Sequence, residues 1–254
     1  MGIEDFKFMT ALEPEGCFVA FQGSERIGVA TCVSYGQVGW FGNLIVKEKY
    51  RGKGVGSLLV KHALNYLKSR EVQTVGLYAY PSLARFYGNL GFRLDEEFSV
   101  LHVESLGSLI AQALPCVESR MIGEIEAFDR RCFGGDRRKL LESIILEKDN
   151  LWYYLTEEAA VAGYVAALVS KAMAWVGPLI CKKDDFDGAV KLLKAVLAGL
   201  SGRTVYIVLP KKETLLANML SGVGFREDFS VSRMFLGEAV AKNCIYAAES
   251  LERG

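Results

Sequence analysis

Several features that mark particular classes of protein are scarce or absent in this chain of 254 residues. Lys+Arg and Asp+Glu both total 30, so the net charge is zero and no basic surface for nucleic acid is indicated. No apolar run approaches the roughly 18 residues of a membrane-spanning helix. The N-terminus, from Met1 to Phe6, has neither the basic region nor the apolar core of a secretion signal. We therefore expect a cytoplasmic protein that binds neither nucleic acid nor a membrane.

Metal-binding and disulfide patterns are also missing. The chain has two histidines and six cysteines, and no two cysteines form a C-x-x-C pair. The cysteines are Cys17, Cys32, Cys116, Cys132, Cys181 and Cys244. Several stand inside apolar runs, so we expect all of them to be reduced, buried and without a metal.

A glycine-rich stretch is the most informative feature that is present. It reads Tyr50-Arg51-Gly52-Lys53-Gly54-Val55-Gly56-Ser57. An apolar run precedes it and an amphipathic segment over residues 55–68 follows it, which predicts a strand, a turn and a helix. Glycines at alternate positions expose the backbone N–H groups, and the start of the helix adds its own N–H groups and its dipole. The stretch therefore predicts a diphosphate-binding turn.

Two commoner phosphate-binding motifs do not fit. A Walker loop needs four residues between its first glycine and Gly-Lys-Ser/Thr, and that spacing is absent. A dinucleotide fingerprint would need glycine in place of Ser57 and an acidic residue about 20 positions later, where the chain has Gly76-Leu77-Tyr78. A dehydrogenase is therefore disfavoured. The remaining alternative from the turn itself is a strand-to-helix connection that binds nothing.

The chain repeats itself. Matching residues recur 135 positions apart in the first part of each copy and 133 positions apart near its end. The matched pairs are Phe18 with Tyr153, Gly28 with Gly163, Trp40 with Trp175, and Gly91 with Gly224. Such a shared offset predicts two copies of one fold, with domains at residues 1–106 and 107–254.

The predicted elements follow the same order in both copies. In copy one we expect helices over residues 4–12, 55–68 and 81–90, and strands over 17–22, 26–34, 38–46, 73–79, 92–93 and 98–103. Copy two has three additional segments, a strand at 116–120 and helices at 121–132 and 138–146. Copy one is thus shorter by roughly 25 residues at its start. Either the chain start is truncated, or another segment such as residues 243–250 fills that edge.

A second motif follows the loop at a fixed distance. It reads Ala84-Arg85-Phe86-Tyr87-Gly88-Asn89-Leu90-Gly91-Phe92. Together with Arg-Gly-x-Gly-x-Gly after a strand, it resembles the GCN5-related N-acetyltransferases. The resemblance is strong over residues 15–102 and weak over 115–236, so it implies a tandem arrangement with a degenerate second copy. It also implies an α/β fold in which each copy has a mixed, mostly antiparallel sheet flanked by helices.

The resemblance implies a site for acetyl-CoA in copy one. In this family the fourth strand splays from the fifth, and its free edge pairs with the pantetheine arm. Leu44, Ile45 and Val46 occupy that strand end. The backbone N–H groups of Arg51, Gly52, Lys53, Gly54, Val55, Gly56 and Ser57 would hold the diphosphate. Tyr87 would protonate the leaving thiolate as general acid, although a tyrosine that only packs under the sheet is the alternative.

A general base is harder to identify. The strand over residues 38–46 has no Asp, Glu or His, and its Asn43 could hold a water but is a poor proton acceptor. Glu13, Glu15 and Glu48 fit surface carboxylates better, and His62 and His102 fit packed or partly exposed side chains better. The base therefore acts through water, or the amine enters already neutral. Pro81-Ser82 stands where many relatives have a cofactor-binding asparagine, so that contact is in doubt.

Copy two has lost these features. Asp187 falls where the loop would bind phosphate, Pro178 replaces Asn43, and Leu220 replaces Tyr87. We expect copy two not to bind coenzyme A, because an aspartate repels a diphosphate. Copy two would complete a shared sheet, wall the acceptor site, or only add stability.

The predicted activity is transfer of acetyl from acetyl-CoA to a primary amine of a small molecule or a peptide. The protein would act as a monomer or a homodimer. The alternative function is a non-catalytic acyl-CoA binder or sensor. Four aromatic residues would line an apolar acceptor site or pack in the core, namely Phe6, Phe8, Tyr35 and Trp40.

Overall fold

The computed structural model describes residues 3–254 and divides into two compact units. Unit 1 contains Met1–Asp95, Arg233–Ala239 and Leu251–Gly254, and unit 2 contains Glu96–Ser232 and Val240–Ser250. Each unit therefore includes chain from both repeats. The boundary at residue 106 remains our proposal for where one repeat ends in the sequence, and it differs from the division into units.

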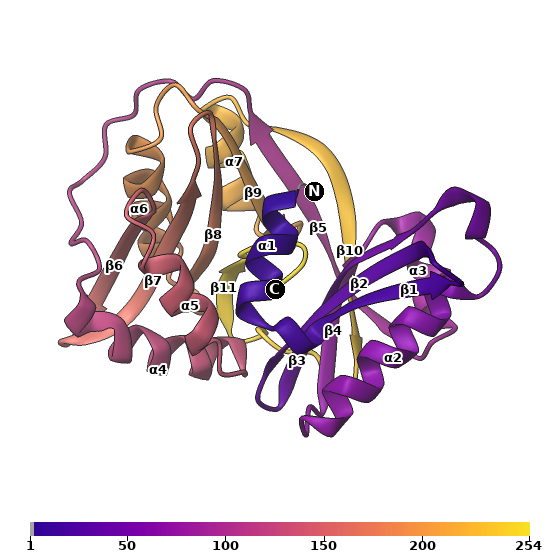
Figure 1. The fold of residues 1–254 in the computed structure, drawn as a ribbon. Helices are drawn as coiled ribbons and strands as arrows, with labels where there is room; N and C mark the ends of the chain where they lie inside the picture. Colours follow the sequence, from indigo (N-terminus) through magenta and orange to yellow (C-terminus); the bar gives the residue numbers. More distant parts are fainter. Residues whose placement is uncertain (1–2) are drawn as a thin grey trace. The chain divides into compact units, whose positions relative to one another are not determined.

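Unit 1 is a sheet flanked by helices (Figure 1). Its strand order is β1-β2-β3-β4-β10, in which β10 covers Arg226–Leu236. The pairs β1–β2 and β2–β3 are antiparallel, and the pair β3–β4 is parallel. Its elements are α1 (Ile3–Leu12), β1 (Cys17–Gln22), β2 (Glu25–Tyr35), β3 (Val38–Val46), α2 (Val55–Ser69), β4 (Thr74–Ala79) and α3 (Ala84–Gly88). Short 3-10 turns cover Pro14–Gly16, Glu48–Tyr50 and Pro81–Leu83.

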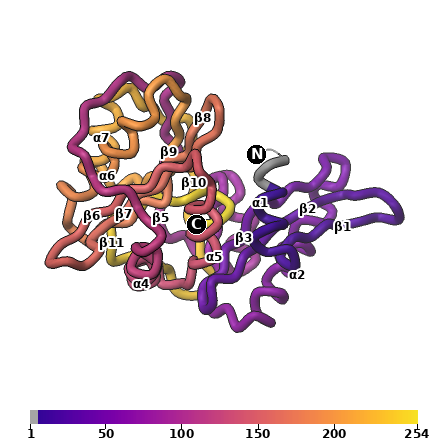
Figure 2. The backbone as a smooth tube through the Cα atoms, turned by 60° about the vertical axis from the view of Figure 1, so that its left-hand side comes forward, coloured from indigo at the N-terminus to yellow at the C-terminus, as the bar shows by residue number. Residues whose placement is uncertain are grey.

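Helix α2 covers one face of this sheet (Figure 2). Its buried stripe consists of Leu59, Val60, Ala63 and Leu67, which share a core cluster with Phe41 of β3. The amphipathic pattern of residues 55–68 predicted a buried face on this helix. Leu58 is not part of that face, because its side chain is 63% exposed.

Unit 2 contains the second version of this arrangement (Figure 1). Its strand order is β5-β9-β8-β7-β6, in which β5 covers Arg93–Val103, and β11 pairs with β8. Among the pairs described for this unit, only β8–β9 is parallel. Its elements are α4 (Ile122–Phe133), α5 (Arg138–Ile145), β6 (Leu151–Glu157), β7 (Ala160–Val169), β8 (Met173–Lys182), α6 (Phe186–Ala198), β9 (Thr204–Pro210), α7 (Thr214–Gly222) and β11 (Cys244–Ala247). The mixed, mostly antiparallel sheet flanked by helices is thus confirmed in both units.

The predicted strand at residues 116–120 was wrong. That segment forms only an isolated bridge between Cys116 and Tyr153, followed by a 3-10 turn over Ser119–Met121. All six cysteines are free thiols, but Cys116 is exposed, so the expectation that all are buried was also wrong. Across residues 3–254, no helix is long and apolar enough to cross a membrane.

Two long strands, β5 (Arg93–Val103) and β10 (Arg226–Leu236), each begin in one unit and end in the other. Residues 98–103 of β5 pair with β9 in unit 2, and β10 lies next to β4 in unit 1. The sequence predicted two separate strands around the polar run Asp95-Glu96-Glu97. The strand is continuous because these carboxylates have partners, for example Asp95, which accepts from Nε of Arg233 at 2.7 Å. Each repeat thus supplies its last strand to the sheet of the other unit.

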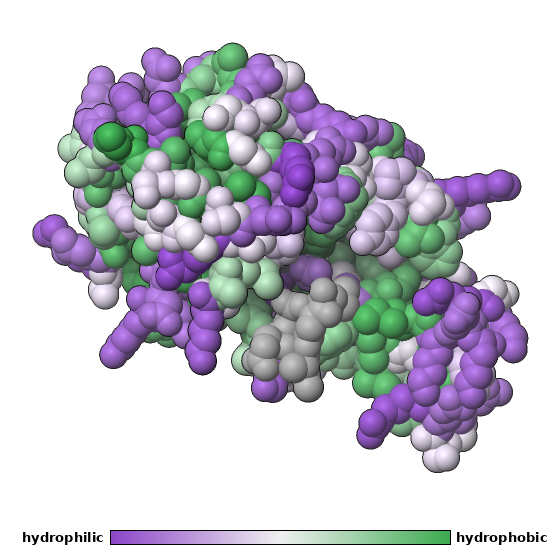
Figure 3. All heavy atoms as spheres, turned by 90° about the horizontal axis from the view of Figure 1, so that it is seen from above, coloured by the Kyte–Doolittle hydropathy of each residue, from purple (hydrophilic) through white to green (hydrophobic). Residues whose placement is uncertain are grey.

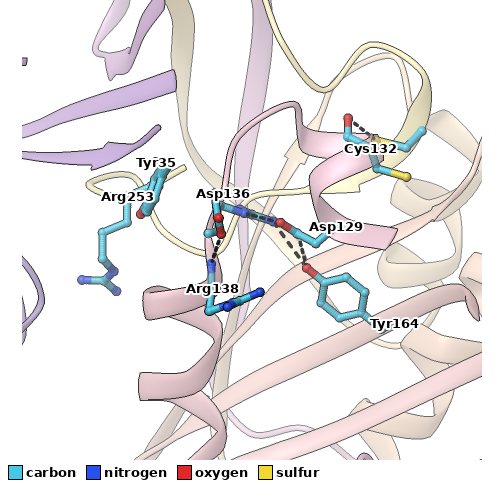
Figure 4. A network of polar contacts seen from close by, with 9 residues as sticks. Tyr35, Asp129, Cys132, Asp136, Arg138, Tyr164 and Arg253 are labelled. Atoms are coloured by element: carbon cyan, nitrogen blue, oxygen red, sulfur yellow. Dashed lines mark hydrogen bonds and ion pairs between the residues drawn. The ribbon is translucent and has the colours of Figure 1, made fainter. Parts of the chain in front are cut away.

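A buried polar network fixes the helical layer of unit 2 (Figure 4). Arg137 donates to both carboxylate oxygens of Asp129, at 2.6 and 3.2 Å, and Tyr164 donates to the same carboxylate. The Arg137 and Asp129 side chains are 0% and 1% exposed. Burial raises the pKa of Tyr164, and the Asp129 charge raises it further. The network joins α4 and the start of α5 to β7, and its charges are compensated by one another.

Candidate functional site

Strands β3 and β4 form a fork in unit 1. They pair in parallel only over Val38–Trp40 and Thr74–Gly76. Beyond Trp40, β3 continues to Val46 and stays paired with β2 on its other side. Successive backbone groups of a strand point alternately to its two sides, so the end of β3 offers N–H and C=O groups toward the fork. Ile45 is 41% exposed there. The fork therefore has the free strand edge that the sequence predicted around Leu44, Ile45 and Val46.

Glycines shape the turn at the end of this fork. Gly52 and Gly54 have φ of +71° and +83°, and a Cβ at either position would meet nothing within 4 Å. Glycine is thus favoured there by backbone conformation and not by crowding. Gly54 is the N-cap of α2, and no side chain caps this helix. The first N–H groups of α2 have no partner within the helix, so they can bind an anion.

Arg51 plays a different part from the one predicted for its backbone. Its N–H donates to the Glu48 carbonyl at 3.0 Å and closes the preceding 3-10 turn. Its Nε donates to the Val46 carbonyl at 3.1 Å. Arg51 therefore ties the turn to the end of β3, and the backbone donors left for an anion are those of residues 52–57.

The lysine side chains beside the turn differ in whether they already pair with a carboxylate. Glu25 accepts from Lys47, Lys49 and Tyr50 at 3.1, 2.9 and 2.8 Å. These hydrogen bonds, that from Lys49 first, lower the pKa of Glu25 to about 2. Lys53 lies 5.7 Å from the Tyr50 ring centre and is exposed. Two of the cations are thus neutralised by Glu25, whereas Lys53 remains available to a negatively charged ligand.

Tyr87 lies in the core on the α2 side of the sheet. It is 5% exposed and packs edge-on against three rings, those of Phe41, Phe86 and Phe92. Leu44 and Val46 belong to the same cluster. Burial raises the pKa of Tyr87 to about 12. The structure thus brings Tyr87 and the end of β3 into one cluster.

The other titratable candidates lie outside this cluster. Glu13 is 8% exposed and accepts from Tyr66 Oη at 2.5 Å and from the Ser34 N–H at 3.3 Å. Its prediction as a surface carboxylate was wrong, whereas Glu15 forms an exposed ion pair with Arg70. His62 is exposed on α2, edge-on to the Phe18 ring.

Three further candidates, one weighed as a base and two as part of the acceptor site, have structural contacts. His102 stacks on Tyr206 in unit 2, with ring centres 5.5 Å apart. Trp40 and Tyr35 are 0% and 1% exposed, and the Tyr35 hydroxyl donates to the Arg253 carbonyl at 3.0 Å (Figure 4). Both residues therefore belong to the core of unit 1.

The corresponding fork of unit 2 is filled by the chain itself. Strands β8 and β9 pair in parallel over residues 173–176 and 204–207. Beyond that point β11 pairs with Leu179–Lys182 of β8, and the Ala248 N–H donates to the Val208 carbonyl of β9 at 3.0 Å. The hypothesis that residues 243–250 complete an edge of copy one was therefore wrong. The apolar run Cys244–Ala247 within them suits a strand in either copy, so the sequence pattern could not decide it.

The start of α6, which corresponds to the start of α2, is also occupied. Asp185 is its N-cap and accepts from the Gly188 N–H at 2.9 Å. Asp187 adds a second negative charge to the first turn. Leu220, at the position of Tyr87, is 0% exposed in the core. The sequence identified Asp187 but missed Asp185, whose position directly before a helix is a typical N-cap signal.

The forked sheet, with a helix that follows its first forked strand, is present in two copies, and the glycine-bounded helix start is found in unit 1. Two family profiles match the chain, "Acetyltransferase (GNAT) family" over residues 2–92 and "Acetyltransferase (GNAT) domain" over residues 125–246. The chain belongs to the GNAT acetyltransferase family and contains two GNAT domains in tandem.

Three proteins illustrate the relationship. The N-acetyltransferase YitH of Bacillus subtilis, itself uncharacterized, is 22% identical over 85% of this chain and 77% of its own. A Pyrococcus horikoshii protein, described as a proposed acetyltransferase, has 23% identity and a TM-score of 0.80 over 98% of this chain and 84% of its own. A tandem GNAT protein from the clavulanic acid biosynthesis pathway has 14% identity and a TM-score of 0.58 over 88% of this chain and 83% of its own. At these sequence identities, the similarity to the two solved structures supports the fold alone.

Proposed function

We propose that this protein transfers acetyl from acetyl-CoA to a primary amine of a small molecule or a peptide, at a single site in unit 1. The fork between β3 and β4 carries this proposal. It joins a free strand edge to an uncapped helix start whose turn requires glycine at positions 52 and 54.

The residues of unit 1 suit coenzyme A. The edge of β3 at Leu44, Ile45 and Val46 would pair with the pantetheine arm as an added strand. Backbone donors of residues 52–57 would hold the diphosphate, and Lys53 would add a positive charge. Arg51 would act mainly by holding the turn against Val46. A backbone N–H of Ile45 or Val46 would meet the negative charge that develops on the thioester oxygen.

Tyr87 is our candidate for the general acid. Attack by the neutral amine forms the N–C bond of the amide, the C–S bond breaks, and the thiolate leaves with a proton. A phenol with its pKa raised to about 12 keeps that proton at neutral pH until the thiolate is formed. The proton of the amine passes to water, since β3 carries no Asp, Glu or His.

The absence of an ionisable side chain on β3 also favours a second candidate function. A protein with the same fork and turn but no acceptor would bind acyl-CoA as a sensor. Turnover distinguishes the two functions, because a sensor binds acetyl-CoA tightly without releasing thiol in the presence of amines.

The experiment measures thiol release from acetyl-CoA with a panel of primary amines and peptides. Amine-dependent release that falls in the Tyr87→Phe variant would support the transferase. Binding of acetyl-CoA without release on any amine would support the sensor. Failure to bind acetyl-CoA would contradict both.

A further inference from the structure

Asn43 occupies an irregular position in β3. Val29 of β2 is opposite Ile45 and Thr31 is opposite Gly42, so Asn43 and Leu44 together face a single residue of β2. This is a β-bulge, and bulges near sites re-aim a side chain. Asn43 has φ of +53°, the left-handed region that asparagine tolerates better than most residues. The bulge directly precedes the strand edge that we assign to acetyl-CoA.

The Asn43 side chain lies on the face of the sheet that is away from α2. Its Nδ2 donates to Thr31 Oγ1 at 3.0 Å. The neighbours of Thr31 in β2, Ala30 and Cys32, belong to the core cluster under α2. Side chains alternate between the faces of a strand, so Thr31 and its partner Asn43 occupy the opposite face.

The other end of this amide is a buried acceptor. Asn43 is 4% exposed, and its Oδ1 has no hydrogen-bond partner among the groups that the structure describes. With Nδ2 bonded to Thr31, Oδ1 is the end of the amide that is left open to a ligand. Buried polar atoms are nearly always paired, so an unpaired one in a native protein indicates a missing partner. A group that meets Oδ1 must be a hydrogen-bond donor.

Copy two differs at this position. Its counterpart in β8 is Pro178, which has neither a side-chain amide nor a backbone N–H. In copy two the fork beside it is filled by β11. The amide is thus present only in the copy whose fork has a free edge.

We infer that Asn43 is a positioning residue for the acceptor, and this inference rests on the function proposed above. Its Oδ1 accepts a hydrogen bond from the attacking amine, directly or through one enclosed water. The bond orients the nitrogen lone pair toward the acetyl carbonyl, across the sheet from Tyr87. Asn43 takes no proton in this role. It replaces the ionisable base that β3 lacks by holding an amine that is already neutral.

The test compares Asn43→Gly with Asn43→Asp in the full chain at saturating acetyl-CoA. Glycine tolerates the left-handed backbone and removes Oδ1, so kcat/KM for the amine should fall at least 10-fold while the acetyl-CoA Kd changes less than 2-fold. Aspartate keeps an oxygen in place, so it should recover most of the loss and introduce a new ionisation into the pH profile of kcat/KM.

A matched control is Glu71→Gly, which changes an exposed position of unit 1 that also has a positive φ, of +62°. It should leave both constants unchanged. Unchanged kcat/KM in Asn43→Gly would overturn the inference and leave the proposed function intact. If Asn43→Gly fails to fold, an Asn43→Asp variant with the wild-type pH profile overturns it instead. A wild-type protein that does not bind acetyl-CoA would overturn the proposed function, and the inference with it.

Discussion

The backbone N–H of Ala248 donates to the carbonyl of Val208 at 3.0 Å and so closes the fork of unit 2 with the chain's own strand. The equivalent fork of unit 1, beyond Trp40, has no such strand among the described pairings. At the helix start beside each fork the same contrast holds, since Asp185 caps α6 whereas no side chain caps α2. Unit 2 therefore makes with its own chain the contacts that the described pairings leave open in unit 1.

The turn conformation gives the first prediction. Gly54→Val should weaken acetyl-CoA binding at least 10-fold, because a β-branched residue at φ of +83° costs about 1–2 kcal/mol and displaces the N–H groups of the turn. Binding is measured by isothermal titration calorimetry. Gly36→Val is the matched control, since Gly36 also has a positive φ and open space around it but lies in the β2–β3 turn. Gly36→Val should lose similar stability and keep its affinity for acetyl-CoA. Equal affinity in both variants would refute the role of the turn in binding acetyl-CoA.

The second prediction concerns the hydroxyl of Tyr87. Tyr87→Phe keeps the three ring contacts and removes only the proton donor, so kcat should fall about 100-fold while the acetyl-CoA Kd is retained. Stopped-flow or steady-state thiol release measures this. Tyr206→Phe in unit 2 serves as a control and should leave kcat unchanged. A Tyr87→Phe enzyme with wild-type kcat would exclude the general-acid role.

The raised pKa of Tyr87 gives a third prediction. A phenol with pKa of about 12 stays protonated, so kcat should show no loss from Tyr87 ionisation between pH 7 and pH 10. The folded-state pKa lies above the ordinary value of 10.0, so this group's contribution to stability is present below pH 10 and lost as the pH rises toward 12. Urea unfolding between pH 8 and pH 11.5 measures this loss. Tyr87→Phe should show a shallower alkaline decline, and an identical decline would contradict the assignment.

The buried ion pair of unit 2 gives a fourth prediction. Arg137→Met should destabilise the fold by roughly 3–5 kcal/mol, because it leaves the Asp129 carboxylate buried without its cation. Adding Asp129→Asn should recover part of that loss. Chemical denaturation of the single and double variants measures it. Exposed Arg120→Met, which breaks only the surface pair with Glu118, should change stability by less than about 1 kcal/mol. Equal effects of Arg137→Met and Arg120→Met would show that the buried network is not structurally important.

Local patterns predicted much of this fold. The strands at Cys17–Gln22 and Val38–Val46 have the predicted bounds, because each is an apolar run ended by turn residues. In α6, Ala189, Leu193 and Val196 are fully buried at the spacing of a helical period. Gly52 and Gly54 have the left-handed conformation that their position in the turn requires.

The errors arose where partners are distant in the sequence. Pairing of β5 with β9 joins residues more than 100 positions apart, and the alternation of β5 suits either sheet. The insertion of β11 into the fork of β8 and β9 likewise depends on which edge is free, which no local pattern encodes. The unpaired Oδ1 of Asn43 required the bulge and the bond to Thr31, and the sequence showed only that Asn43 was polar.

The central claim is that the protein has one acetyl-CoA site and that it lies in unit 1. Isothermal titration of the full chain with acetyl-CoA tests it most directly, run on the wild type and on Gly54→Val. We predict one site per chain in the wild type and at least 10-fold weaker binding in Gly54→Val. Two sites per chain, no binding, or one site with unchanged affinity in Gly54→Val would contradict it.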